Sequence, residues 1–218
     1  MKSADDYLNL LDRGVSASKA LASLPQCELQ YVAKVPIGVY VAARWFGWRF
    51  FPVRRTRSSA VSTVLIDRAT DNLEQLKRWA RTRPQWALTT GPESGVFAVE
   101  VDGDRGRHSL LQLCGDDWDW LFTLRTQGGR KRYILYNWPQ SHITIPTSIF
   151  LGEGLSLLGD GGWLLFPPSR EADGVQHVFL TRSTATEAPA WLLDHLCRAE
   201  GAVRRDAVRP LQGGFLAS

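Results

Sequence analysis

The chain has 218 residues, of which 44% are hydrophobic and 22% charged, and this balance excludes a disordered or fibrous protein and predicts a globular fold with a sizeable core. The formal net charge is +4, and most of the 26 basic residues are arginines, whose planar guanidinium can bind two phosphate oxygens at once. The charge therefore favours a polyanionic partner, although an arginine-rich composition also follows from a GC-rich genome.

Neither export nor membrane insertion is expected. The start of the chain, MKSADDYLNLLDRG, is acidic where a signal peptide would be basic and then apolar. The most apolar stretch, Val35–Val53, contains Arg44 and Arg49, so a helix followed by a short strand explains it better than a membrane span. The cysteines are far apart and lack zinc-site spacing, which is typical of buried thiols in a reducing compartment, and we expect a cytoplasmic protein with free Cys27, Cys114 and Cys197.

The first third of the chain is predicted to be mostly helical. In order, we expect two short helices within residues 1–30, a helix over Gly38–Phe46, a strand over Trp48–Val53 and a loop over residues 54–62. The next helix carries the apolar stripe Leu73, Leu76 and Trp79, and Asp71 is expected to cap its start.

The rest of the chain is predicted to mix short strands with helices. Strands are expected at Trp86–Thr90, Val96–Asp102, Arg132–Asn137 and Trp163–Phe166, and helices at Arg107–Cys114 and Ala188–Arg198. This order predicts an α/β (α+β) fold with a mixed central β-sheet flanked by helices. The expected organisation is a helical segment over residues 1–35, one domain over residues 36–198 and a flexible basic tail over residues 199–218.

Two carboxylates, Glu100 and Asp102, lie one residue apart at the end of the apolar strand in GVFAVEVDGDRG. Side chains alternate along a strand, so both carboxylates point to the same face, where their charges repel. One explanation is a strand end whose acids face water before a turn formed by Gly103 and Gly106. The other is a site for a hard divalent cation, such as Mg²⁺ or Mn²⁺, which carboxylates hold beside substrate phosphates.

Several short motifs follow one another in an order known from one family. These are GWRFFPV, then ATD before a helix that ends in tryptophan, then SGVFAVEVDG, TQGGRKR and GDGGWLLFPPS. Their order and spacing resemble the N-terminal domain of bifunctional DNA primase/polymerases, members of the archaeo-eukaryotic primase superfamily that occur on plasmids, phages and integrated elements. The resemblance extends from about Tyr40 to Leu196, although each motif taken alone is unspecific.

The resemblance implies that Glu100 and Asp102 bind the divalent metals, Mg²⁺ or Mn²⁺, that assist nucleotidyl transfer. In the family, a histidine after the Gly-Gly turn holds the triphosphate of the incoming nucleotide, and a third acid before the last Gly-Gly completes the metal site. In this chain the two positions hold Lys131 and Ser156. A lysine can pair with a phosphate as a point charge, whereas a neutral serine is a weak ligand for Mg²⁺.

The turn residues Gly128, Gly129 and Arg130 are further candidates for nucleotide binding, with a solvated basic strand edge as the alternative. An arginine-rich segment before the ATD motif contains Arg54, Arg55 and Arg57. These arginines are candidates for contact with template or nucleotide phosphates, and the same sequence is equally compatible with a solvated loop.

Two other acids lie near Ser156 in the sequence. Glu153 has an odd offset from Ser156, which would point it to the opposite face of a strand, and Asp160 is expected to form a bend before Gly161. The segment Pro167–Ser169 is expected to form a rigid edge turn or a substrate loop. The four histidines are scattered and suggest no catalytic pair.

Two functional hypotheses follow. The chain is a DNA primase/polymerase-like domain of a replication or mobile-element protein, with weakened nucleotidyl transfer on a single-stranded DNA or primer-template from nucleoside triphosphates, and with a helicase acting from a separate chain. The alternative is a catalytically inactive primase-like module that binds single-stranded nucleic acid, a nucleotide or a replication partner. Lys131 and Ser156 favour the second hypothesis, and retention of the paired acids favours the first.

Overall fold

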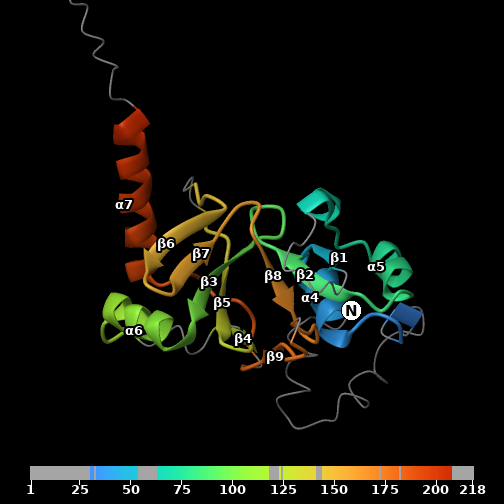
Figure 1. Ribbon diagram of the computed structural model, residues 1–218. Helices are drawn as coiled ribbons and strands as arrows, with labels where there is room; N and C mark the ends of the chain where they lie inside the picture. Colours follow the sequence, from blue (N-terminus) through green and yellow to red (C-terminus); the bar gives the residue numbers. More distant parts are fainter. Residues whose placement is uncertain are drawn as a thin grey trace, which may run out of the picture.

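The computed structural model describes residues 30–31, 33–53, 63–117, 123, 125–140, 144–171, 173–181 and 183–207. These residues form two β-sheets with helices packed against them (Figure 1). The smaller sheet has the order β1-β2-β8, with β1 over Phe50–Val53, β2 over Gln85–Thr89 and β8 over Trp163–Phe166. The larger sheet has the order β6-β7-β3-β5-β4-β9, with β3 over Val96–Asp102, β4 over Arg125–Gly128, β5 over Lys131–Asn137, β6 over Ser148–Gly152, β7 over Leu155–Leu158 and β9 over Val178–Phe179.

The predicted α+β class is confirmed, but the sheet pairing is antiparallel where a mixed central sheet was expected. All the named strand pairs of both sheets are antiparallel. Two hairpins explain part of the difference, because β4 and β5 are joined by Gly129 and Arg130 alone, and β6 and β7 by Glu153 and Gly154. A two-residue connection can join only antiparallel neighbours, since a parallel pair needs a long crossover.

The helices cover opposite sides of the molecule. Helices α4 (Ile37–Phe46) and α5 (Leu73–Ala80) lie with the smaller sheet, together with the short 3-10 helix η1 (Thr63–Arg68), whereas α6 (Gly103–Cys114) and α7 (Ala190–Ala207) lie beside the larger sheet (Figure 1). Among the described residues, no helix is long and apolar enough to cross a bilayer.

The central strands β3 and β5 of the larger sheet are buried on both faces because each alternates two apolar sets. Ala98 of β3 and Leu135 of β5 belong to a core shared with α4 and the smaller sheet. Val99 of β3 and Ile134 of β5 point the other way, into a core that includes Leu110 of α6 and two leucines of α7. Glu100 and Asp102 have the parity of Ala98, so they lie on the face that is turned toward the smaller sheet.

Several predicted elements are confirmed and others are corrected. The helix ending before Gly47 and the strand Val96–Asp102 occur as expected, and Gly47 ends α4 in the left-handed conformation that favours glycine (φ 68°). The cap of α5 is Asn72 instead of Asp71, because the Asn72 side chain accepts a hydrogen bond from the Gln75 amide.

Two helix boundaries were wrong. Gly103 and Gly106, predicted to form a turn, instead lie in the first part of α6. Gly106 lacks a side chain for a packing reason, since a Cβ there would lie 2.1 Å from the carbonyl oxygen of Gly154. Helix α7 continues past Arg198, its predicted end, to Ala207. The two helices predicted within residues 1–30 fall almost entirely outside the described residues, and the proposed three-part organisation of the chain stays a prediction.

Candidate functional site

The paired acids lie at the end of β3, between β7 on one side and β5 on the other. Glu100 is directly opposite Ser156 of β7 and Tyr133 of β5, and Asp102 is directly opposite Lys131 of β5. Directly opposed residues of an antiparallel pair point to the same face, with Cβ atoms about 4.5–5.5 Å apart. The structure therefore brings together on one face the four residues that the sequence singled out, Glu100, Asp102, Lys131 and Ser156.

Each acid of the pair is engaged by a basic side chain. Lys131 Nζ lies 2.9 Å from Glu100 Oε1, in a contact that is half-buried, since the Glu100 side chain is only 18% exposed. Arg130 Nε lies 3.2 Å from Asp102 Oδ1 in a more open position. The repulsion expected between the two carboxylates is thus relieved by two cations of the chain itself.

Tyr133 completes the surroundings of Glu100. Burial raises the pKa of the Tyr133 phenol, and the negative charge of Glu100 and a hydrogen bond to it raise this pKa further. The phenol therefore stays protonated and acts as a hydrogen-bond donor to the Glu100 carboxylate. Lys131 contacts one oxygen of Glu100, and Tyr133 is directly opposite Glu100 in the β3–β5 ladder.

The donor set departs from the three-acid metal site that the resemblance implies. Glu100 and Asp102 each contact a side-chain cation, and the position of the third acid holds the hydroxyl of Ser156. In the part of the chain that the structure describes, no group of three or more His, Cys, Asp or Glu side chains could hold a metal ion. Two carboxylates alone bind Mg²⁺ or Mn²⁺ weakly unless further oxygens contribute.

One buried histidine near this face was missed by sequence reasoning. His177 is fully buried, its ring stacks on that of Tyr133 with centroids 6.2 Å apart, and its Nε2 lies 2.7 Å from Glu171 Oε1. A Cβ at Gly128 would lie 2.2 Å from His177 Nε2, so this glycine makes room for the imidazole. Gly129 is needed for a different reason, because it adopts a left-handed φ of 57° in the β4–β5 turn.

Comparison with known families gives a match for most of the chain. The family model of the N-terminal domain of bifunctional DNA primase/polymerases matches residues 39–191. The chain belongs to this family. A search of curated proteins gave no significant match. The resemblance stated from the sequence is thereby confirmed, and the chain contains a DNA primase/polymerase-like domain, of a family whose members in general use divalent metals.

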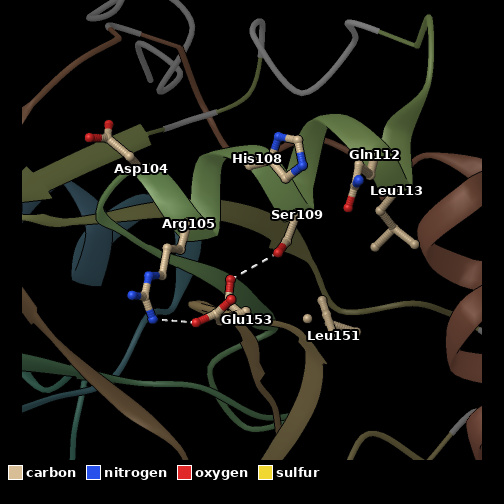
Figure 2. A pocket seen from close by; sticks show the side chains of 9 residues that line it. Asp104, Arg105, His108, Ser109, Gln112, Leu113, Leu151 and Glu153 are labelled. Carbon is tan, nitrogen blue, oxygen red and sulfur yellow. Dashed lines mark hydrogen bonds and ion pairs between the residues drawn. The ribbon is translucent and has the colours of Figure 1, made fainter.

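Neither of the two nearby acids lies beside Ser156 in the strand ladder of this primase/polymerase domain. Glu153 lies in the β6–β7 turn and forms an ion pair with Arg105 of α6, and its carbonyl oxygen accepts a hydrogen bond from Ser109 (Figure 2). Asp160 lies beyond the other end of β7, where its carboxylate approaches Gly91. Glu153 is therefore engaged by α6, and Asp160 lies at the opposite end of β7 from Glu153.

The remaining sequence candidates divide into two groups. Ser169, at the end of the Pro-Pro-Ser segment, is buried and bonds through its hydroxyl to both the amide and the carbonyl of Trp86, at 2.7 and 3.0 Å. These bonds tie the end of β8 to β2, as a rigid edge turn requires. The other group, Arg54, Arg55 and Arg57, lies outside the described residues.

Proposed function

We propose that this primase/polymerase domain binds single-stranded DNA or a primer-template and nucleoside triphosphates, and that its template-directed nucleotidyl transfer is weakened. The observation that carries the proposal is the pairing of Lys131 with Glu100 at 2.9 Å. We take the domain to serve a replication or mobile-element protein. A cytoplasmic location belongs to the same proposal and is supported by the free thiols of Cys114 and Cys197.

The weakening follows from what an ammonium group can and cannot do. Phosphoryl transfer places negative charge on the attacking and leaving oxygens, and a divalent metal both neutralises this charge and fixes the two oxygens in line. The Lys131 ammonium carries one positive charge instead of two and coordinates no oxygen. Its place beside Glu100 also competes with any metal for that carboxylate. Metal bound at Glu100 and Asp102 is therefore expected to be weak and poorly positioned.

An inactive module that only binds single-stranded nucleic acid, a nucleotide or a replication partner is the second candidate. The hydroxyl of Ser156 opposite Glu100 favours it, because the third carboxylate of the family site is missing there. The two candidates differ in turnover and share the scaffold.

Primer extension with the unmodified chain tests the proposal. With Mn²⁺ and all four deoxynucleoside triphosphates, we expect slow extension that the matched variant Asp102→Ala abolishes. Absence of extension at high enzyme concentration, together with retained binding of the same primer-template, would establish the inactive module. Rapid, processive extension would contradict the weakened site.

A further inference from the structure

A second charged site lies on the other face of the larger sheet, between the start of α6 and the β4–β5 hairpin. It is a pocket of about 470 Å³ whose lining includes four arginines, Arg105, Arg107, Arg130 and Arg132. The only acid among its lining residues is Asp104. Gln127 and Arg132 are directly opposed in the β4–β5 ladder, so they share the face opposite to Lys131.

The arginines of this pocket differ in how far they are already neutralised. Arg105 is turned toward Glu153 and forms an ion pair with it (Figure 2). Arg130 contacts Asp102. Arg107 and Arg132 are exposed, and no ion pair with a described acid is found for either. Two guanidinium groups are thus available at one pocket.

Their charge also acts on the surroundings. Burial, and then the positive charge of Arg132, lower the pKa of Arg125, which has the same strand parity as Gln127. A concentration of like charge in a concave site costs free energy unless an anion compensates it. Guanidinium groups match the geometry of phosphate oxygens, which they can bind through two parallel hydrogen bonds.

We propose that this pocket binds backbone phosphates of the DNA strand that reaches the acid pair. Arg130 supports a strand as the source of the phosphate, since the same side chain lines the pocket and contacts Asp102. A strand that ends at the acid pair passes this corner of the sheet, and its preceding phosphates meet Arg107 and Arg132. The inference rests on the proposed function, because it assumes that DNA is the ligand.

Fluorescence anisotropy of a labelled single-stranded oligothymidylate, measured over a range of salt concentrations, tests this pocket. The double variant Arg107→Ala/Arg132→Ala should weaken binding by about tenfold at low salt. It should also make the slope of log affinity against log salt shallower by about 1.4, for two lost phosphate contacts at about 0.7 each. The variant Arg107→Lys/Arg132→Lys keeps the charge without the guanidinium fork and should give an intermediate affinity.

The matched control is Arg68→Ala/Arg78→Ala, which removes two exposed arginines of η1 and α5, elements that lie with the smaller sheet. Thermal unfolding of each variant shows whether the fold is retained, and the lysine variant keeps the test valid if the alanine variant fails to fold. The proposal that this pocket binds DNA phosphates is overturned if the alanine variant binds the oligonucleotide like the unmodified chain. It is equally overturned if the control variant loses as much affinity as the alanine variant. It is also overturned if only the affinity for dATP falls, since a free nucleotide would then be its ligand. An unmodified chain that binds no oligonucleotide would instead refute the proposed function itself.

Discussion

Replacing Lys131 with methionine removes the ammonium beside Glu100 while keeping an unbranched apolar stem of similar length. Two unit charges about 3 Å apart attract by about 5–6 kcal/mol at the effective dielectric of a protein surface. Most of this gain is offset by desolvation, and the Lys131 side chain is 43% exposed, so solvent screens the pair further. We therefore expect Lys131→Met to lower the free energy of unfolding by about 1–2 kcal/mol.

The more informative effect of Lys131→Met concerns divalent metal. The substitution leaves Glu100 and Asp102 as two carboxylates on one face, with only Arg130 beside Asp102. A cation that binds the folded chain at tenfold its dissociation constant stabilises it by about 1.4 kcal/mol. For a chain of this length each kcal/mol of stability corresponds to about 2–4 °C in melting temperature. Millimolar Mn²⁺, taken as about ten times its dissociation constant, should therefore raise the melting temperature of the variant by about 3–6 °C.

The assay is thermal denaturation with and without MnCl₂, for the unmodified chain, Lys131→Met and two controls. Lys131→Arg keeps a cation beside Glu100 and should respond as little as the unmodified chain. Lys131→Met/Glu100→Gln removes the carboxylate and should lose the response. An equal Mn²⁺ shift in the unmodified chain and in Lys131→Met would refute the reasoning, because Lys131 would then not compete with metal.

Three further predictions concern the same face of the sheet. Ser156→Asp adds a third carboxylate opposite Glu100, so it should destabilise the metal-free chain and increase Mn²⁺ affinity in calorimetric titration, and an unchanged affinity would contradict the register. Gly128→Ala places a Cβ against the buried His177 ring and should cost about 1–3 kcal/mol in urea denaturation, whereas full stability would show that the ring can move. The pKa of Tyr133 is raised in the folded chain, so the folded state holds this proton more tightly than the unfolded state does. Stability should therefore fall as pH rises above about 10, by about 1.4 kcal/mol per pH unit. In urea denaturation at pH values on either side of about 10, Tyr133→Phe should remove this part of the loss, and an identical pH dependence of variant and unmodified chain would contradict the prediction.

The strand carrying the acid pair could be predicted from the sequence because its pattern is local. Val96–Asp102 is bounded by glycines and contains both acids, so its extent and their shared face followed from alternation alone. The positions of Lys131 and Ser156 beside them came from motif order in the family, which conveys the strand register without any contact being visible in the sequence.

Other parts of the site depend on contacts between distant segments. Nothing near His177 in the sequence indicates that its ring stacks on Tyr133 and fills the space above Gly128. Strand β4 is polar and β9 has two residues, so neither carried a strand pattern. The start of α6 was missed because Gly103 and Gly106 are residues typical of turns. Position 106 holds a glycine because the backbone of Gly154 approaches α6 too closely to leave room for a side chain. The pairing of Lys131 with Glu100 depends on side-chain direction, which strand register alone leaves open.

Primer extension by the variant Lys131→His/Ser156→Asp tests the proposed weakening most directly, since it introduces the histidine and the third acid that the family resemblance implies at these two positions. Against a slow or inactive unmodified chain, we expect the double variant to extend a primer measurably with Mn²⁺, and Asp102→Ala in the same background to abolish that extension. Misplacement of a catalytic ion by about 1 Å costs on the order of a hundredfold in rate, so even partial restoration should be visible. Rapid extension by the unmodified chain, unaffected by either restoring substitution, would contradict the account.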